Sequence, residues 1–437
     1  MTNSETKNFS QNVSSSYHLE DRNKNIPKLR FKEYNDEWKK VKLKDICSDF
    51  IVPMRDKPKE FNGNIPWCRI EDIEGNYFHG TKSNQYVSQE TIDVMNLKII
   101  PTGSVICSCS ASLGTYAINT RPIITNQTFI GLVCSDKISN HFLLNLMHTQ
   151  TKKLRIIAGG TTIPYISREK FEEYNIKIPN KDEQEKIASF LTLIDKKIEK
   201  QKELVELLKK YKRGLLSQIF SQNLRFKDDK GNDYPAWEEK TINNIFDTVT
   251  DFVAAGSFAD LRKNVLYNEK PDFAQLVRTV DLKNNFKNKD FVFVNKSAYK
   301  YLWRVNLNED ALILPNIGAN IGEIYYIYSF KLPYKNNVLG PNAILLKSSN
   351  NNLYYLYSGC LTDNFRKQLF LQVGASGQPK FNKTDFKKIK IKISINIDEQ
   401  SKISKILSKF DDKIQQEEYL LNYLQTYKKG LLQQMFI

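Results

Sequence analysis

The sequence predicts a mixed α/β protein in which two globular units alternate with two long helices. Three observations lead to this fold class. The chain has 437 residues, which is more than one ordinary core accommodates. Its second half repeats its first half, and each half ends in an apolar stripe at helical spacing. Hydrophobic residues make up 41% of the chain, which is enough for two real cores.

The repeat is clearest at the end of each half. The segment Asp182-Glu183-Gln184 returns 216 residues later as Asp398-Glu399-Gln400. From there the two segments match without a gap as far as Phe220 and Phe436, and nearly half of the aligned positions are identical. A match of this extent indicates a duplicated supersecondary unit.

Upstream the repeat is weaker but keeps its order. Arg69-x-x-Asp72 in the first half meets Arg278-x-x-Asp281 in the second. The run Leu29-Arg30-Phe31, followed by Trp38, meets Leu224-Arg225-Phe226, followed by Trp237. The chain therefore reads as globular unit, helix, globular unit, helix, with similar helices and diverged globular units.

Residues 182–220 and 398–436 are predicted to form the long helices. Their apolar residues recur at spacings near 3.5 residues or multiples of it, with Lys, Glu and Gln between them. The stripe consists of Ile187, Leu191, Ile194, Ile198, Val205 and Leu208 in the first helix, and of Ile403, Leu407, Phe410, Ile414, Leu421 and Leu424 in the second. Such a stripe favours a mutual coiled coil, a spacer about 58 Å long. The alternative is two separate docking helices, each buried elsewhere.

These patterns set the expected boundaries. We expect a disordered tail over 1–25, globular units over 26–180 and 223–396, and spacer helices over 181–222 and 397–437. The tail is polar and lacks the apolar segment of a signal peptide, and no uninterrupted apolar run is long enough to span a membrane. We therefore expect a soluble, cytoplasmic protein with reduced thiols and no membrane partner.

Composition and motifs favour a binding protein over an enzyme. The formal net charge of +16 favours a polyanionic partner, either nucleic acid or an anionic membrane surface. The six cysteines form no CxxC pair and the four histidines have no ligand spacing, so no metal site is predicted. The sequence contains no GxxxxGK[ST] phosphate loop and no Asn-Pro-Pro-Tyr-like motif of an adenine methyltransferase. We predict no catalytic residue.

From about Pro27 to its C-terminus, the chain resembles the specificity subunits of Type I restriction-modification systems. The strongest marker is the doubled segment that runs from Asp182-Glu183-Gln184 to Tyr211-Lys212-Arg213-Gly214-Leu215-Leu216 and returns from Asp398 to Leu432. The resemblance implies two target-recognition domains separated by two long conserved helices, packed as an antiparallel coiled coil about a pseudo-twofold axis. It implies a non-catalytic subunit that reads a bipartite, asymmetric site in double-stranded DNA.

The resemblance also implies partners. Two modification subunits would methylate adenine, and two restriction subunits can join them. S-adenosylmethionine, ATP and Mg would belong to those partners, with no cofactor in this chain. The helix faces outside the apolar stripe are expected to be solvated or available to the modification subunits; they include Lys196, Lys200, Lys209, Lys212 and Lys428.

DNA reading requires donors and acceptors at base edges and basic residues at phosphates. In the first unit we expect these roles for Arg69, Ser110, Ser112, Asn126, Gln127, Thr161 and Thr162, with Arg55 and Lys57 as phosphate contacts. In the second unit we expect them for Arg278, Asn316, Asn320, Asn342, Gln378 and Lys380, with Arg262 and Lys263 as phosphate contacts.

Two alternatives stay open at this point. Arg69 and Arg278 recur in units that should read different bases, which favours a structural ion pair with Asp72 and Asp281, or a phosphate contact, over base reading. The rival classes for the whole chain are a duplicated coiled-coil scaffold, whose globular units bind proteins and have no DNA specificity, and an enzyme with a divergent active site.

Overall fold

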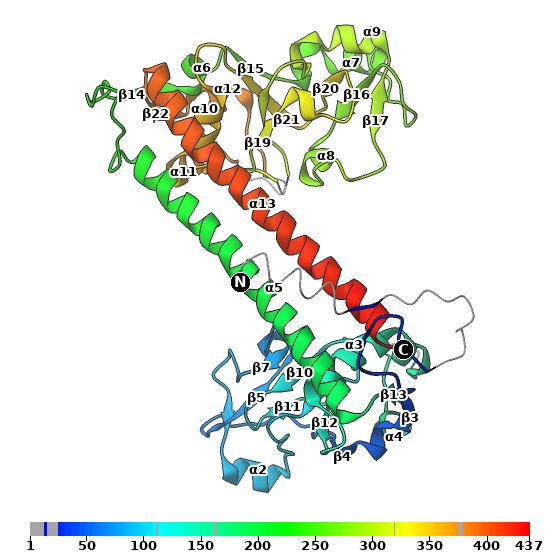
Figure 1. The fold of residues 1–437 in the computed structure, drawn as a ribbon. Helices are drawn as coiled ribbons and strands as arrows, with labels where there is room; N and C mark the ends of the chain where they lie inside the picture. Colours follow the sequence, from blue (N-terminus) through cyan, green and yellow to red (C-terminus); the bar gives the residue numbers. More distant parts are fainter. Residues whose placement is uncertain (1–12, 15–24, 111, 161–163, 319, 375–378) are drawn as a thin grey trace. The chain divides into compact units, whose positions relative to one another are not determined.

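The computed structural model describes residues 13–14, 25–110, 112–160, 164–318, 320–374 and 379–437. It divides into unit 1, Met1–Leu204 with Glu417–Ile437, and unit 2, Val205–Gln416. Each unit is mixed α/β and contains part of each long helix, α5 (Lys181–Phe220) and α13 (Ile397–Met435) (Figure 1). The predicted fold class is confirmed. The tail expected over 1–25 lies largely outside the described residues, and Val13–Ser14 within it pair with residues 30–31.

Unit 1 is organised around a six-stranded sheet, in the order β4-β12-β9-β10-β7-β6, and a three-stranded sheet, β11-β5-β8. The pairs β13-β3 and β1-β2 complete its sheets. Its strands are β1 (Val13–Ser14), β2 (Arg30–Phe31), β3 (Lys39–Lys42), β4 (Cys47–Ile51), β5 (Ile65–Cys68), β6 (Ile73–Glu74), β7 (Tyr77–Phe78), β8 (Tyr86–Val87), β9 (Val105–Ser108), β10 (Tyr116–Asn119), β11 (Ile124–Thr125), β12 (Phe129–Cys134) and β13 (Asn175–Ile178). Its shorter helices are α2 (Gln89–Met95), α3 (Asn140–Ile157) and α4 (Arg168–Glu172), with 3-10 turns η1 (Leu43–Asp45) and η2 (Ile70–Asp72).

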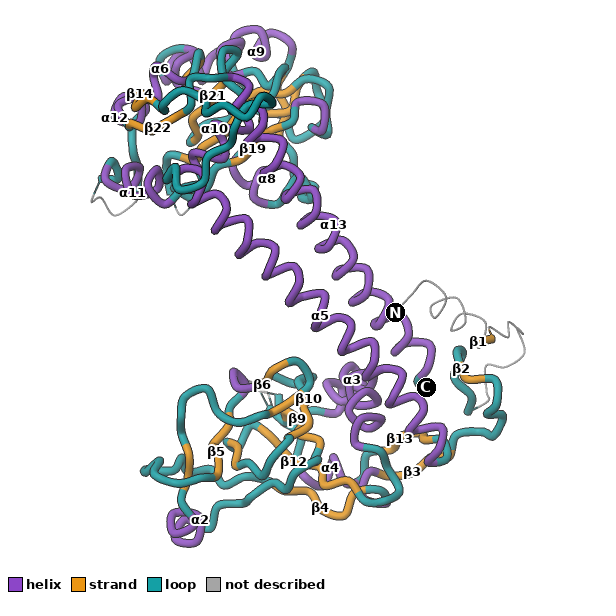
Figure 2. The backbone as a smooth tube through the Cα atoms, turned by 60° about the vertical axis from the view of Figure 1, so that its left-hand side comes forward, coloured by secondary structure: helices purple, strands orange, loops and turns teal. Residues whose placement is uncertain are grey.

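The central strand of unit 1 is buried on both faces. Along β9, Val105 and Cys107 enter the core that α3 covers, whereas Ile106 enters a second cluster with Phe78 and Phe129. This alternation is the period-two pattern of a strand. The β5 sheet and α2 lie at the end of unit 1 away from α3 (Figure 2).

Unit 2 repeats this plan with a four-stranded sheet, β15-β21-β18-β19, and a three-stranded sheet, β17-β16-β20; β14 pairs with β22. Its strands are β14 (Glu238–Thr241), β15 (Thr248–Asp251), β16 (Ala274–Val277), β17 (Val292–Val294), β18 (Ala311–Pro315), β19 (Tyr325–Ile327), β20 (Asn337–Leu339), β21 (Ala343–Lys347) and β22 (Lys390–Ile393). Its helices are α6 (Ile242–Ile245), α7 (Phe258–Asn264), α8 (Thr279–Lys283), α9 (Lys296–Tyr301), α10 (Leu353–Cys360), α11 (Asp363–Leu371) and α12 (Lys383–Lys388), with 3-10 turns η3 (Phe252–Ala255), η4 (Trp303–Val305) and η5 (Ser329–Lys331).

One long helix of unit 1 is replaced by two shorter helices in unit 2. In unit 1, α3 runs unbroken for 18 residues. At the corresponding place unit 2 has α10 and α11, and the second of these begins afresh at Thr362, whose hydroxyl accepts the N–H of Phe365 at 3.3 Å. A side-chain N-cap of this kind satisfies a backbone donor that a new helix start leaves open.

The repeated Asp-Glu-Gln motif anchors the start of α5 inside unit 1. The Glu183 side chain is fully buried and makes two hydrogen bonds with the Arg30 guanidinium, at 2.8 and 2.7 Å. The indole N–H of Trp38 donates to the same carboxylate at 3.4 Å. Gln184, also buried, accepts the Ser139 N–H at 3.0 Å. The Leu-Arg-Phe and Trp repeat thus supplies the partners of the buried Glu.

Unit 2 builds the same anchor from the second copy. Trp237 donates its indole N–H to Glu399 at 3.0 Å, and the Ser394 hydroxyl donates at 2.6 Å. Arg225 lies 3.8 Å from the other carboxylate oxygen, which is an ion-pair distance without a hydrogen bond. The most strongly repeated residues of the chain therefore hold helix starts.

The predicted apolar stripe contributes to two kinds of packing. Ile187 and Leu191 lie in the core of unit 1, and Ile403 and Leu407 lie in the core of unit 2. Of the remaining stripe residues, Val205, Ile414 and Leu424 are buried, and Ile194, Ile198, Leu208, Phe410 and Leu421 are half-buried. The docking alternative thus describes the first turns of each helix.

Contacts between the helices lie farther along them. In unit 1, the amide of Gln201 donates to the Glu417 carbonyl at 3.1 Å, and Lys428 forms an ion pair with Asp195. Since the residue numbers rise on one helix as they fall on the other, the two segments run antiparallel (Figures 1 and 2). Side-chain packing between half-buried stripes is typical of coiled coils.

Unit 2 contains the repeat-related ion pair, Lys212 with Asp411. The Lys212 and Lys428 side chains are only 14% and 15% exposed. The expectation that these two lysines are solvated or available to partners is therefore wrong, because each one neutralises a carboxylate on the neighbouring helix. Among the described residues, no helix has the length and apolarity needed to cross a membrane.

Candidate nucleic-acid interface

Three loops of unit 1 meet at one place: 109–115, 126–128 and 158–167, as far as they are described. The N–H of Cys109 donates to the Thr128 carbonyl at 2.8 Å. The carbonyl of Cys109 accepts the N–H of Ile166 at 2.9 Å, and Ser110 forms a bridge with Tyr165. Cys109, the residue that follows β9, therefore connects all three loops through its backbone hydrogen bonds.

Unit 2 joins three corresponding loops in the same way, within their described residues: 316–324 without 319, 340–342, and 372–382 without 375–378. The N–H of Asn316 donates to the Asn342 carbonyl at 3.2 Å, and the Asn316 carbonyl accepts the N–H of Phe381 at 3.1 Å. Ile317 bridges Lys380. We call each set of three loops a loop cluster. The backbone framework is repeated, whereas the side chains on it differ.

Parallel strands place the repeated arginines next to these clusters. In unit 1, β5 and β11 are parallel with Cys68 opposite Thr125, so Arg69 and Asn126 follow at the same sheet edge. In unit 2, β16 and β20 are parallel, and the Gly340 N–H donates to the Val277 carbonyl at 2.8 Å, just before Arg278. Carboxyl ends of parallel strands are a common location for binding residues.

In each cluster a glycine with positive φ allows the loop to approach a helix closely, because it has no Cβ. Gly114 (φ 103°) lies beside Thr151 of α3, and a Cβ added to it would come within 2.6 Å of that side chain. Gly322 (φ 91°) lies beside Phe370 of α11 in the same manner. Arg155 of α3 also donates to the Leu113 carbonyl at 2.8 Å. Sequence reasoning missed this bracing role for Arg155.

The predicted polar residues of unit 1 come together, but not all of them point outward. Ser112 and Gln127 are exposed, and Ser110 is half-buried. Asn126 is half-buried, and its side-chain oxygen accepts the Thr128 hydroxyl at 2.6 Å, which makes it a turn former in this structure. Thr161 and Thr162 lie outside the described residues.

Unit 2 divides its predicted residues similarly. Asn342 (φ 69°) and Lys380 are exposed at the cluster. Asn316 donates its amide to the Phe381 carbonyl at 3.3 Å, a bond within the cluster. Asn320 accepts from Lys283 at 3.0 Å, and this brings in a lysine that the sequence reasoning did not single out. Gln378 lies outside the described residues.

The residues predicted to contact phosphates lie in different kinds of place in the two units. Arg55 is exposed in the segment after β4, and Lys57 lies over the rings of Phe61 and Trp67, close to Arg69. Arg262 and Lys263 are exposed in the last turn of α7, which packs against η3 and α9.

Arg278 has the structural role that the sequence left open. Its guanidinium donates to Asp281 at 2.9 and 3.2 Å and to the Asp290 carbonyl at 2.6 Å. Hydrogen bonds to the Asp281 carboxylate, and then to the Asp290 carboxylate, raise the pKa of Arg278. The Asp281 side chain is fully buried, so the pair is part of the fold.

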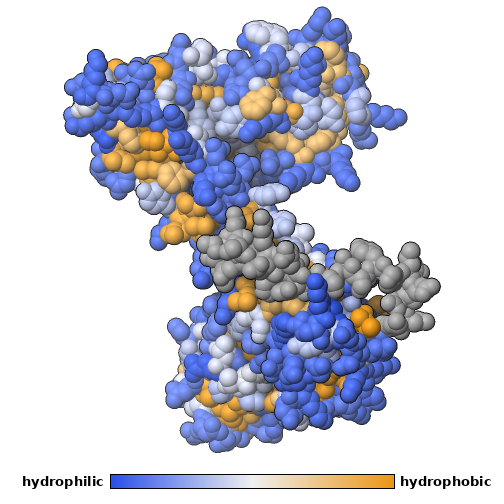
Figure 3. All heavy atoms as spheres, viewed as in Figure 1, coloured by the Kyte–Doolittle hydropathy of each residue, from blue (hydrophilic) through white to orange (hydrophobic). Residues whose placement is uncertain are grey.

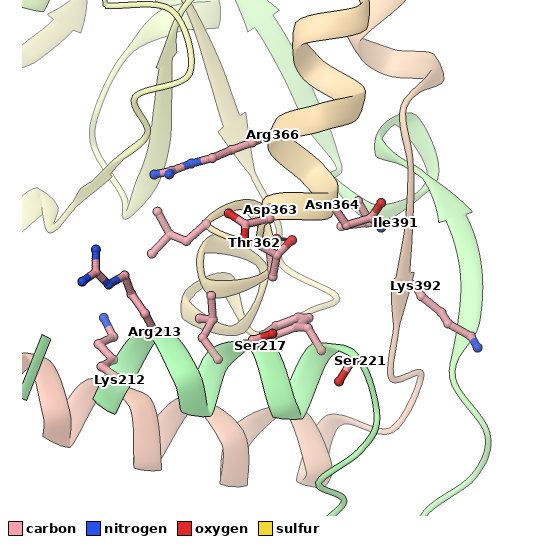
Figure 4. Close-up of a pocket in the computed structure, with 14 residues that line it drawn as sticks. Lys212, Arg213, Ser217, Ser221, Thr362, Asp363, Asn364, Arg366, Ile391 and Lys392 are labelled. Atoms are coloured by element: carbon pink, nitrogen blue, oxygen red, sulfur yellow. Dashed lines mark hydrogen bonds between the residues drawn. The ribbon is translucent and has the colours of Figure 1, made fainter. Parts of the chain in front are cut away.

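A separate pocket of about 510 Å³ lies in unit 2 between α5 and the start of α11. Figure 4 shows Thr362 and Asp363 near its middle, with Arg213 and Arg366 on one side. Leu216 and Phe220 form part of its apolar wall. On the face drawn in Figure 3, hydrophobic colour gathers around the region of α11, where Phe370 and Leu371 are 52% and 81% exposed.

The fold and these loop clusters define a class of protein: a duplicated α/β protein whose two units each carry a similar loop framework with different exposed side chains. A family model described as the Type I restriction modification DNA specificity domain matches residues 35–209 and 234–426. The chain belongs to this family of Type I specificity subunits, as the resemblance indicated.

Individual relatives cover most of the chain. The Type I restriction enzyme MjaIX specificity subunit of Methanocaldococcus jannaschii is 26% identical over 360 residues, 78% of this chain and 80% of the relative. The MjaVIII specificity subunit of the same organism is 22% identical over 415 residues, 91% of each. A crystal structure of a Type I restriction-modification S subunit from M. genitalium has the same fold, with a TM-score of 0.56 at 19% identity, covering 94% of this chain and 99% of that one.

Proposed function

We propose that this chain reads a bipartite, asymmetric sequence in double-stranded DNA, one part with each loop cluster. The observation that carries the proposal is the repeated three-loop framework with different exposed side chains on its two copies. Ser112 and Gln127 are exposed on one cluster, and Asn342 and Lys380 are exposed on the other. Base edges are distinguished by such donors and acceptors, so different side chains select different bases.

In this proposal the chain itself performs no chemistry. It acts in the cytoplasm with two modification subunits, which methylate adenine with S-adenosylmethionine, and two restriction subunits, which use ATP and Mg. Membership in the specificity-subunit family supports this division of labour. The target-recognition domains would be 26–180 and 223–396, with 181–222 and 397–437 as their spacer helices.

Salt dependence separates this proposal from the rival protein-binding scaffold. The chain, assembled with its modification subunit, should bind duplex DNA with an affinity that falls as salt rises, by a log–log slope of about 0.9 per phosphate contact. Fluorescence anisotropy at several salt concentrations measures this slope. An assembled complex that binds DNA no better than the modification subunit alone would favour the scaffold.

Exposed apolar residues on the long helices support the modification subunits as protein partners. Leu207 and Tyr211 of α5 are 62% and 59% exposed, and their repeat counterparts Tyr423 and Tyr427 of α13 are 56% and 47% exposed. Large apolar side chains exposed at the same repeat positions are typical of an interface. A duplicated surface suits two copies of one partner.

Changing Leu207 and Tyr211 together to Asp should therefore remove one of the two modification subunits. The reason is that two carboxylates would be buried without partners in that interface. Multi-angle light scattering of the assembled complex measures the stoichiometry. Leu371→Asp, at an 81% exposed residue of α11, is the control and should leave assembly intact. Equal loss in both variants would contradict an interface at these helix positions.

A further inference from the structure

The repeated Arg-x-x-Asp motif contains two separable features. Asp72 accepts the backbone N–H of Arg69 at 2.7 Å and that of Lys82 at 2.6 Å. Asp281 accepts the backbone N–H of Arg278 at 2.8 Å. Both aspartates are buried, and both cap the turn that follows the strand. The capping role therefore accounts for the recurrence of the aspartate, and the arginine contributes only its backbone N–H to it.

The two arginine side chains have different surroundings. Arg278 is neutralised by Asp281 and Asp290. The Arg69 guanidinium instead lies over the Trp67 ring, 4.7 Å from its centroid, and donates to the neutral side chain of Gln85. Among the described residues its ion pair is with Glu71, 3.5 Å away, whose side chain is 58% exposed. Solvent screens an exposed ion pair of this length. Glu71 therefore neutralises little of the positive charge of the Arg69 guanidinium.

A second cation shares the Trp67 ring. The ammonium of Lys57 lies 5.5 Å from the ring centroid and 5.6 Å from that of Phe61. Trp67 is 6% exposed and packs in a cluster with Val87 and Ile92, so the ring is fixed. An arginine held on a fixed aromatic ring loses less freedom when it binds an anion than a free side chain does.

The position of this group is next to the loop cluster of unit 1. Arg69 follows β5 and Asn126 follows β11 at the edge that the parallel pair creates. The Arg69 side chain is 31% exposed, and Lys57 is exposed. Two cations and one fixed ring, with only a solvent-screened carboxylate near them, therefore lie beside the polar side chains that the proposed function assigns to DNA.

We propose that Lys57 and Arg69, held on Trp67, each contact a DNA phosphate beside the part of the site read by unit 1, whereas Arg278 makes no DNA contact. This inference rests on the proposed function. It assigns different roles to two residues at the same repeat position. It also implies that the two units contact DNA phosphates through different positions of the repeat, because in unit 2 residues other than Arg278 must make those contacts.

The test compares Arg69→Gln with Arg278→Gln in the chain assembled with its modification subunit, on duplex DNA that carries the recognised site. Arg69→Gln should weaken binding by about tenfold at physiological salt. It should also lower the log–log salt slope by about 0.9, with the preference among substituted sites unchanged. Arg278→Gln should keep the wild-type slope and lower the melting temperature.

Lys57→Gln provides a second variant, because its exposed side chain makes little contribution to the fold; it should reduce the slope in the same way. Wild-type slopes in both Arg69→Gln and Lys57→Gln would overturn the inference. A relaxed preference at one position of the site in Arg69→Gln would overturn it too, since that result marks base reading. A wild-type complex without salt-dependent DNA binding would instead refute the proposed function, so the two failures are distinguishable.

Discussion

Exchanging residues 26–180 for the matching region of a relative should change one half of the methylated sequence and leave the other half intact. Each loop cluster is assembled from loops of its own unit, so the side chains exposed on one cluster are set by that unit's sequence. Modified-base sequencing of cells carrying the chimaera with its modification subunit gives both halves at once.

The structure sharpens the design of this exchange. Arg30 and Trp38 lie inside the exchanged region, whereas Glu183, their buried partner, lies outside it. The donor must therefore have Arg and Trp at the matching positions. The reciprocal exchange of 223–396 is the matched control and should change the other half only. A change in both halves from either exchange would contradict reading by separate units.

Glu183→Ala should destabilise unit 1 by about 3–5 kcal/mol, because it leaves the Arg30 guanidinium, whose side chain is 9% exposed, without its carboxylate. It also removes an acceptor from the buried indole N–H of Trp38. Thermal or denaturant unfolding of the purified chain measures the effect. The transition of unit 2, which has its own anchor at Glu399, should stay in place.

Glu173→Ala is the matched control within unit 1. Its carboxylate binds Lys42 and Lys44, which hold the pKa of Glu173 at about 2, but its side chain is 51% exposed and both lysines are over 40% exposed. Exposed ion pairs contribute little to stability, so this variant should unfold close to the wild type. Equal shifts from Glu173→Ala and Glu183→Ala would show that burial of the Glu183 pair has no special weight.

The sequence predicted the elements whose evidence is local and repeated. The helix pattern that begins at Asp182 and Asp398 corresponds to α5 and α13 because amphipathic periodicity is written in consecutive residues. Lys212 and Lys428 were misjudged because their partners, Asp411 and Asp195, become neighbours only once the helices pack antiparallel. A signal for this existed, since both members of each pair recur at the same offset.

The polar loops of the candidate site could be chosen from the sequence, whereas the exposure and hydrogen-bond partners of their side chains could not. Polar residues near Ser110 and Asn316 were expected to meet DNA, and their loops do converge in each unit. Which side chains remain outward depends on bonds from distant segments, such as that between Asn316 and the Phe381 carbonyl. Likewise, Arg69 and Arg278 share a local motif, and only tertiary neighbours separate them.

The central proposal is that this chain selects the DNA sequence that the modification subunit methylates. Modified-base sequencing of cells that express the modification subunit, with and without this chain, tests it most directly. We expect methyladenine in a split motif with two different halves, present with the chain and absent without it. The same methyladenine pattern in both cells, with the modification subunit verified in each, would contradict it.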